Sequence, residues 1–460
     1  MSSLTVANGL LVKPTGVTPA TVLVGDGRVQ ALLRPNDRPS AETTIDAGGR
    51  YVIPGCIDAH VHLGLSQSFD DACWNESRAA VTGGVTTMMH YLLSAGSFFD
   101  IYEEQVKAVE GHAFIDMFFH GLVRNDTQVS EIPRTVEELG ITSYKFHMAM
   151  KGPEAAYGIS GVDDGALYEG LLQVAALRGV MALVHAESID VILRFRERMI
   201  ADHPDATDTA TWTRYRPAFT EEEAIARATR LAEAAGAPLG IIHNSVGTGP
   251  ALLAGAKATY PHLYMETCPQ YLMLHKDMPL GTWGKVNPPL RGTEDSEMLW
   301  SALATGQIDW MGSDHCDYTL ATREGSLWDV GPGLPSGMTM ILPSLLTGGL
   351  NEGRLSLPRI VELTSSTAAR LFGLSPRKGT VEVGSDGDLV ILDDQREVTI
   401  TPESLNSFSD YTPYEGLVAK GWARTTIAGG EVLYDRGEVN DAPSRRGRVL
   451  RQDRSNPPVL

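Results

Sequence analysis

Two histidines near residue 60 have the spacing of a pair of metal ligands. In Asp58-Ala59-His60-Val61-His62 the imidazoles stand two residues apart, so on a β-strand both point to the same face. Such a pair can supply two nitrogen ligands to one metal ion, because imidazole binds zinc and other transition metals readily. The pattern is equally compatible with a strand that carries two partly exposed histidines.

Three further residues of ligating type follow short apolar runs later in the chain. His185 and His243 end the runs VMALVH and LGIIH, and Asp314 stands in the segment MGSDH. Each has an ordinary alternative, namely a histidine in or beside the core, or an aspartate that caps a helix or loop. With the first pair they provide ligands for two metal ions: His60, His62 and Asp314 for one, and His185 and His243 for the other.

A lysine occupies the position where a bridging anion is needed. Two dications in one site repel each other unless they share an anionic ligand. The run ITSYKFHM offers neither Asp nor Glu at its end and carries Lys145 instead. A lysine that loses a proton and adds CO2 becomes an anionic carbamate, so we expect Lys145 to be an N6-carboxylysine that bridges the metals. Taken alone, Lys145 would also suit the solvated end of a strand.

The elements that must position these residues are eight apolar runs separated by helix-like stretches. The runs lie at 56–62, 85–91, 114–123, 141–148, 180–186, 239–245, 263–269 and 308–315. Strands that alternate with helices predict a parallel α/β fold, and eight of them predict a closed (β/α)8 barrel of the TIM type. The candidate ligands stand near the C-terminal ends of their runs, where barrel enzymes keep their chemistry. We therefore expect them to converge at one mouth.

The clearest helix between the runs is TEEEAIARATRLAEAAG, residues 220–236. Its Ala, Glu and Leu residues recur with a helical period. Thr220 can cap its first turn, Glu223 completes a capping box, and Gly236 can end the helix.

The two ends of the chain have a different residue pattern from the middle. Residues 1 to about 50, and again about 380 to 440, read as short β segments broken by Gly, Asn, Asp and Pro. We predict a small β-sandwich domain formed by residues 1–52 and 378–440, with the hydrolase barrel, residues 53–377, inserted between them. Residues 441–460 form a basic, polar C-terminal tail.

Composition excludes several classes of protein. The chain has 460 residues, of which 43% are hydrophobic and 21% charged, as in a soluble globular protein. Its formal net charge of -19 argues against a nucleic-acid partner, which needs clustered Lys and Arg. Four scattered cysteines without a CxxC pair predict reduced thiols rather than a disulfide framework. The N-terminal segment lacks the features of a signal peptide and no apolar run could span a bilayer, so we predict a cytoplasmic protein with no membrane contact.

Over its full length the chain resembles the hydantoinase and dihydropyrimidinase branch of the amidohydrolase superfamily. The resemblance rests on motifs in the family's order: IPGCIDAHVHL, TGGVTT, SYKFHMAMKG, HAES, EEEAIARA, IIHNS, ETCPQYL, NPPLR, GSDHCDY, KGTVEVGSDGDLVILD and YEGLVAKGWARTTIAGGEVL. It implies one metal held by His60, His62, Lys145 and Asp314, and a second held by carboxylated Lys145, His185 and His243. Zinc is the usual metal in such sites, and manganese is the alternative.

The resemblance also implies a cyclic amidohydrolase that opens a hydantoin- or dihydropyrimidine-like ring. A hydroxide that bridges the metals attacks the ring carbonyl, while one metal polarises the carbonyl oxygen. Asp314 is the catalytic residue that accepts the hydroxide proton and can deliver it to the leaving ring nitrogen. The family further implies a homo-oligomer, commonly a tetramer, in which the C-terminal tail packs against a neighbouring subunit.

The chain departs from the family at substrate-binding positions. Hydantoinases place an oxyanion-stabilising tyrosine five residues after the bridging lysine, where this chain has Met150, which cannot donate a hydrogen bond. Either the metals fill that role alone, or His147 or Tyr157 replaces it; His147 also suits a plain barrel-wall residue. Asn287 and Gly337 occupy the regions whose backbone binds the substrate imide. These differences predict an unusual ring within the class, with methionine as an apolar wall.

The residues also bear on four other functions. Allantoinases share the metal constellation and often lack the tyrosine, whereas dihydroorotases follow the histidine pair with an arginine, where this chain has Leu63 and Gly64. A non-catalytic relative of dihydropyrimidinase that acts in assembly would have lost ligands, and none is missing. A deaminase of the same superfamily would use one metal and no bridging lysine.

Overall fold

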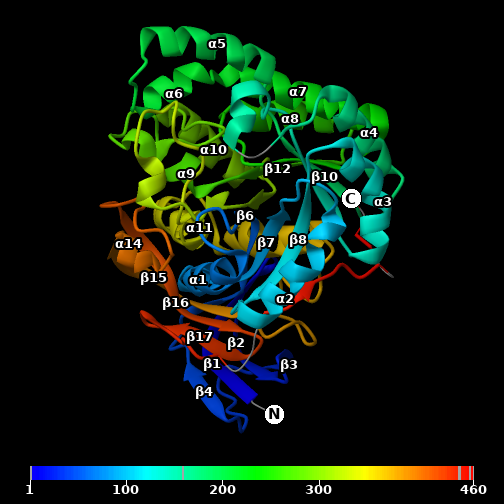
Figure 1. The fold of residues 1–460 in the computed structure, drawn as a ribbon. Helices are drawn as coiled ribbons and strands as arrows, with labels where there is room; N and C mark the ends of the chain where they lie inside the picture. Colours follow the sequence, from blue (N-terminus) through cyan, green and yellow to red (C-terminus); the bar gives the residue numbers. More distant parts are fainter. Residues whose placement is uncertain (1–2, 158–159, 444–446, 455–456, 459) are drawn as a thin grey trace.

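The computed structural model describes residues 3–157, 160–443, 447–454, 457–458 and 460. A parallel sheet forms its centre, and helices surround that sheet (Figure 1). The sheet runs in the order β13-β12-β11-β10-β9-β8-β7-β6-β14, and every pairing along it is parallel. Its strands are β6 (Cys56–His62), β7 (Val85–Leu92), β8 (Asp116–Val123), β9 (Ser143–His147), β10 (Met181–His185), β11 (Leu239–Ile241), β12 (Leu263–Thr267), β13 (Trp310–Met311) and β14 (His315–Cys316). The eight predicted runs therefore supply these strands, and the predicted α/β barrel class is confirmed.

The two edge strands of this sheet are pieces of the eighth predicted run. β13 pairs with β12 through Trp310 and Met311, and β14 pairs with β6 through His315 and Cys316. Only residues 312–314 separate the two strands in the chain, so the sheet returns to its own first strand and closes. Asp314 lies in that short interruption, at the seam of the barrel.

Helices follow the strands and pack outside the barrel, as the alternating pattern predicts. They are α1 (Phe69–Thr82), α2 (Tyr102–His112), α3 (Asp126–Glu138), α4 (Asp164–Ala175), α5 (Ile189–Asp202), α6 (Thr209–Tyr215), α7 (Ala218–Ala235), α8 (Gly249–Lys257), α9 (Pro269–Met273), α10 (Thr293–Thr305), α11 (Gly337–Ser344), α12 (Leu357–Val361), α13 (Thr367–Leu371) and α14 (Pro402–Leu405). Shorter helical turns are η1 (Phe98–Asp100), η2 (Gly152–Tyr157), η3 (Gly281–Gly284), η4 (Leu320–Arg323), η5 (Leu345–Asn351) and η6 (Glu362–Ser366).

The N-terminal cap predicted for the 220–236 helix is wrong by three residues. α7 begins at Ala218 after Pro217, and the Thr220 hydroxyl donates to the Pro217 carbonyl instead of capping the first turn. Proline suits this boundary because it needs no backbone N–H partner. The predicted end is confirmed, since Gly236 adopts the left-handed conformation with a φ of 75°.

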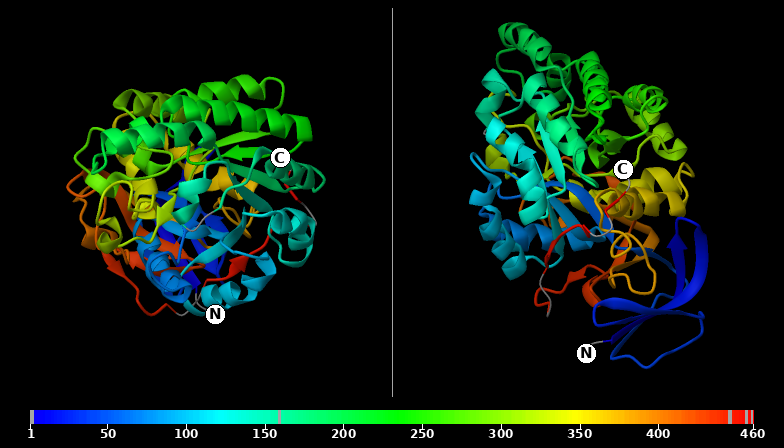
Figure 2. Two further views of the ribbon diagram at one scale, coloured as in Figure 1. Left: turned by 45° about the horizontal axis from the view of Figure 1, so that its top comes forward. Right: turned by 90° about the vertical axis from the view of Figure 1, so that its right-hand side faces the viewer.

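Segments from both ends of the chain form a second sheet below the barrel (Figure 1). Its backbone order is β18-β17-β16-β15-β5-β1-β2-β3, with β4 beside β1, and β5 joins the two halves by pairing with β15. In the right-hand view of Figure 2 the N-terminal strands project beyond the barrel. The strands are β1 (Ser3–Lys13), β2 (Gly16–Gly25), β3 (Arg28–Leu33), β4 (Thr43–Asp46), β5 (Tyr51–Pro54), β15 (Leu389–Thr399), β16 (Val418–Ala428), β17 (Glu431–Asp435) and β18 (Glu438–Val439).

The described part of the C-terminal tail lies on the barrel of its own chain. β19 (Val449–Leu450) pairs in parallel with β8 through Met117 and Phe118. Beside it, the buried Lys378 ammonium lies 2.8 Å from Asp116 of β8 and 2.6 Å from Asp388. These contacts join the barrel, the terminal sheet and the tail.

The cysteines and the helices bear on two predictions made from composition. The four cysteines are buried and free, as the absence of a disulfide framework predicts: Cys56, Cys73, Cys268 and Cys316. Among the described residues, no helix combines the length and the apolar character that crossing a membrane requires.

Candidate metal centre

His60, His62 and Asp314 meet at the C-terminal end of the barrel. The Oδ1 of Asp314 lies 3.1 Å from the Nε2 of His60 and 3.4 Å from the Nε2 of His62. One potential ligand atom from each of the three residues lies within 4.8 Å of the other two. Burial, aided by the nearby Lys145, lowers the pKa of His62 to about 3, so its ring is neutral and has a lone pair to offer at neutral pH.

Lys145 projects from β9 into the same cluster. Its Nζ lies 2.9 Å from the Nε2 of His60 and 3.2 Å from the Nε2 of His62, and its side chain is almost completely buried. Burial lowers the pKa of this ammonium, because charge is poorly solvated there. The structure thus brings the predicted bridging position against both histidines.

His185 and His243 form the other half of the cluster. Their ring centroids are 4.4 Å apart, and the His243 ring lies 5.3 Å from that of His60. Both ring nitrogens of His243 are buried without a hydrogen-bond partner among the residues described. An unpartnered buried imidazole is costly unless something else satisfies it, and a metal ion is a natural candidate.

Two ligand positions adopt a backbone conformation that is uncommon for residues other than glycine. His243 has a φ of 41° and Asp314 a φ of 53°, both in the left-handed region. His243 lies two residues after β11, and Asp314 lies in the short interruption between β13 and β14. Strain of this kind concentrates at functional sites, where the surrounding structure holds it in place.

Two buried glutamates orient the histidines, and neither of them was predicted as a site residue. Glu266 of β12 accepts a hydrogen bond from the Nδ1 of His60 at 2.7 Å, and Glu187 accepts one from the Nε2 of His185 at 2.7 Å. Each carboxylate holds the ring proton on the outer nitrogen and leaves the other nitrogen free to bind a metal. Both glutamates lie in motifs that the chain shares with the hydantoinase branch, ETCPQYL and HAES. These motifs were the feature of the sequence that could have indicated them.

A cavity of about 280 Å³ opens onto the cluster. Its walls include Met150, His147 and Asn287 from the predicted substrate-binding set, together with Tyr318 and Gly333, which were not predicted. Gly337 does not line this cavity; it begins α11, and a Cβ there would lie 2.8 Å from the carbonyl oxygen of Ser313. The side chain of Tyr157 lies outside the described part of the structure.

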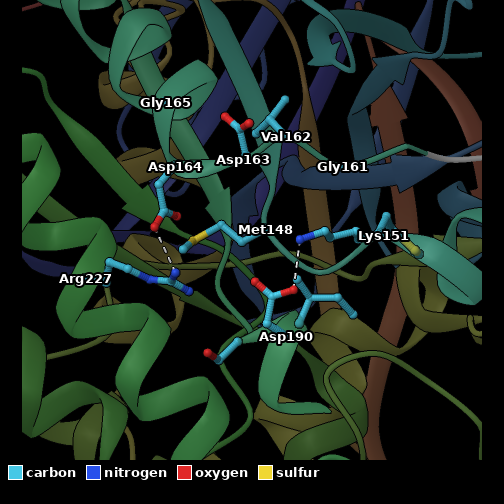
Figure 3. Close-up of a pocket in the computed structure, with 12 residues that line it drawn as sticks. Met148, Lys151, Gly161, Val162, Asp163, Asp164, Gly165, Asp190 and Arg227 are labelled. Carbon is cyan, nitrogen blue, oxygen red and sulfur yellow. Dashed lines mark hydrogen bonds and ion pairs between the residues drawn. The ribbon is translucent and has the colours of Figure 1, made fainter. Parts of the chain in front are cut away.

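A second cavity, of about 600 Å³, lies on the other side of Met150. Met150 lines both cavities. Two ion pairs flank the second one (Figure 3): Lys151 with Asp190 at 2.8 Å, and Arg227 with Asp164 at 2.9 Å. Met150 is therefore a wall residue shared by the metal-facing cavity and a larger cavity that is flanked by ion pairs.

The donor set fits divalent metal ions. Four imidazoles and a carboxylate converge, and both ring nitrogens of His243 have no hydrogen-bond partner among the described residues. The amidohydrolase family profile matches residues 51–433 of this sequence, which covers most of the chain. The chain belongs to the amidohydrolase family.

Individual relatives of this amidohydrolase narrow the comparison. It is 33% identical to an L-hydantoinase from Paenarthrobacter aurescens over 95% of this chain and 96% of the relative. It is 35% identical to a D-phenylhydantoinase from Escherichia coli O1:K1 over 99% of each chain. Its fold matches the solved L-hydantoinase (dihydropyrimidinase) from Arthrobacter aurescens with a TM-score of 0.90, at 33% identity, over 98% of this chain and 100% of that one. The chain is thus a cyclic amidohydrolase by descent.

Proposed function

We propose that this amidohydrolase opens a hydantoin- or dihydropyrimidine-like ring with the help of two divalent metal ions. The observation that carries the proposal is the position of Lys145, whose Nζ lies against two imidazole nitrogens in a buried cavity. A cationic ammonium has little reason to be buried beside ligands of a cation. A carbamate at the same place supplies the anion that two metals need to share.

The carbamate forms by a simple addition. The lone pair of the neutral Lys145 nitrogen attacks the carbon of CO2, the new N–C bond leaves the charge on oxygen, and the nitrogen releases one proton. The product offers two oxygens toward the ligand cluster. We assign His60, His62, carboxylated Lys145 and Asp314 to one metal, and carboxylated Lys145, His185 and His243 to the other.

Bound zinc, or manganese as the alternative, would lower the pKa of a water molecule and so supply the nucleophile at neutral pH. Asp314 is suited to handle the proton. Burial alone would raise its pKa, but the neighbouring His60 and His62 hold the pKa of this carboxyl well below its usual range. It is therefore ionised, accepts the proton of the attacking water, and returns it to the ring nitrogen as the C–N bond breaks.

The cavity walls support a ring with a sizeable substituent. Met150 and His147 face the site from the lysine side, and Asn287 faces it from another. We propose that the ring imide is bound by Asn287 and by the segment from Gly333 to Gly337, which reaches the cavity through Gly333 and not through Gly337. Met150 then packs against the ring or its substituent. Allantoin is the second candidate substrate, because Met150 lacks the hydroxyl that hydantoinases have at this position.

A ring panel with metal analysis tests the proposal. Purified enzyme loaded with zinc or manganese is offered hydantoins, dihydrouracils, allantoin and cyclic imides, and loss of ring absorbance is followed. For wild type we expect turnover of at least one ring and two bound metal ions per chain. For Lys145→Ala we expect neither turnover nor the two bound metal ions. Metal-free protein with an unmodified Lys145, or a Lys145→Ala variant that keeps its metals and its activity, would contradict the two-metal model.

Assembly and location follow from the resemblance. We propose a cytoplasmic homotetramer with residues 441–460 near a subunit contact; the four free cysteines suit a reducing compartment. Light scattering tests the assembly, and a monomer at micromolar concentration would contradict it.

A further inference from the structure

His147 shares one face of β9 with the bridging lysine. Side chains two residues apart on a strand point to the same side, so Lys145 and His147 both face the cavity, and both line it. The His147 ring stacks on that of His185, with centroids 3.7 Å apart and an interplanar angle of 18°. His147 therefore lies beside the proposed metal ligands but is not itself one of them.

A backbone hydrogen bond fixes which nitrogen of His147 carries the proton. The N–H of Ala149 donates to the Nδ1 of His147 at 3.1 Å. A nitrogen that accepts a hydrogen bond has no proton of its own, so the ring is the neutral form with its proton on Nε2. Within the described part of the chain, that Nε2 has no hydrogen-bond partner and does not belong to the fully buried polar atoms. It is a free N–H donor in a cavity wall.

Besides the proposed ligands and His147, three polar side chains line the cavity. The Cys316 thiol is directed to the carbonyl oxygen of Asp314. The side-chain oxygen of Asn287 accepts from Trp212, and the buried amide N–H of Asn287 has no partner among the described residues, so it is free for the ring imide that we assign to this residue. Tyr318 follows Asp314 by four residues, and its ring packs against the guanidinium of Arg323. His147 is the donor on the Lys145 and His185 side of the cavity, the same side as Met150.

We propose that the Nε2–H of His147 donates a hydrogen bond to the ring carbonyl oxygen as negative charge develops on it. This inference rests on the proposed function. As the water oxygen bonds to the carbonyl carbon, the C=O electron pair moves onto oxygen, and His147 stabilises it without giving up its proton. The pair returns when the C–N bond breaks and the ring nitrogen takes its proton from Asp314. His147 thus fills the role that the missing hydroxyl at position 150 would have had.

His147→Phe tests the donor, because phenylalanine keeps a flat ring against His185 and removes the N–H. We expect kcat to fall roughly a hundredfold, the loss typical of one oxyanion donor, with the metal content unchanged. KM should change by less than about threefold, since the bond strengthens only in the transition state. Adding Met150→Tyr to His147→Phe should recover part of the lost kcat.

His90→Phe is the matched control. His90 is also a buried histidine whose Nδ1 accepts a backbone N–H, from Leu63, but it does not line the cavity. His90→Phe should have the kcat of wild type. The inference would be overturned if His147→Phe had the same kcat as wild type. It would also be overturned if kcat fell in Tyr318→Phe and not in His147→Phe. If wild type opens no ring in the panel, the proposed function itself fails, which is a separate result.

A spectroscopic measurement tests the geometry without turnover. In 15N-labelled enzyme the His147 ring should show a protonated Nε2 and an unprotonated Nδ1. Its signal is assigned as the one lost in His147→Phe, or in His147→Asn if the first variant is poorly folded, and a proton on Nδ1 would overturn the inference.

Discussion

The Nδ1 of His60 lies 2.7 Å from the Oε1 of Glu266, and both side chains are fully buried. The same carboxylate accepts hydrogen bonds from the indole of Trp310 at 2.6 Å and from the backbone N–H of His243 at 3.0 Å. Glu266 therefore connects two proposed ligands, His60 and His243, with Trp310 of β13.

Glu266→Gln should weaken metal binding by about 10- to 100-fold, the usual effect of losing such an outer partner of a metal-bound histidine. Glutamine keeps the size of the side chain but lacks the charge that holds the proton on Nδ1 of His60. Chelator competition measures the affinity. Asp309→Asn is the control, since Asp309 is a partly buried carboxylate that caps the backbone of Met265 and contacts Lys257. Equal losses in both variants would argue against a specific role for Glu266.

Lys285 gives a pH dependence of stability that can be isolated. Its Nζ donates to the carbonyl oxygen of Leu327 at 2.6 Å, and burial lowers its pKa from 10.5 to about 7. Between these two pH values the unfolded chain binds a proton that the folded chain does not. The free energy of unfolding therefore contains a contribution that rises with pH across this window.

Lys285→Met should flatten that dependence. Urea unfolding of wild type and variant at several pH values between 7 and 10 measures the difference. The free energy of unfolding of wild type, relative to that of the variant, should increase as pH rises, because only wild type has the Lys285 ammonium. Parallel curves would mean that Lys285 keeps its proton in the folded enzyme.

Lys378 is a buried cation shared by three carboxylates. Its Nζ lies 2.8 Å from Asp116, 3.1 Å from Asp386 and 2.6 Å from Asp388. Lys378→Met leaves these charges without their central partner and should lower the free energy of unfolding by about 3–5 kcal/mol. Lys13→Met removes a solvent-accessible pair with Glu382 and should cost less than about 1 kcal/mol. Similar midpoints of urea unfolding for the two variants would contradict this account.

Met150 should determine the size of substituent that the enzyme accepts. Because Met150 lines both cavities, Met150→Trp places a larger side chain in the wall that they share. We expect KM for a ring with a long substituent to rise about tenfold or more, while an unsubstituted ring changes by less than about threefold. Met148→Ala, which enlarges only the second cavity, should leave the unsubstituted ring unaffected. Equal effects on both rings would show that the substituent does not pass Met150.

The sequence by itself determined the barrel, the family and which residues come together. Apolar runs and the polar residues at their ends are local features of the chain, and parallel strands bring those ends to one side. His60, Lys145, His185 and Asp314 could therefore be named from position alone, and the structure does bring them into one cluster, His185 through the ring of His243. The family motifs then gave the class of reaction.

Only the tertiary structure decided how those side chains are held. Glu266 and His60 are 206 residues apart, and nothing in the periodicity of either strand indicates their hydrogen bond. The start of α7 was missed because Pro217 and the packing around it outweigh the capping preference of Thr220. The proton position on His147 depends on the path of the backbone at Ala149, and the place of Met150 between two cavities depends on loops around it. Such features arise from contacts between distant segments, which a pattern of residue types along one strand or helix does not contain.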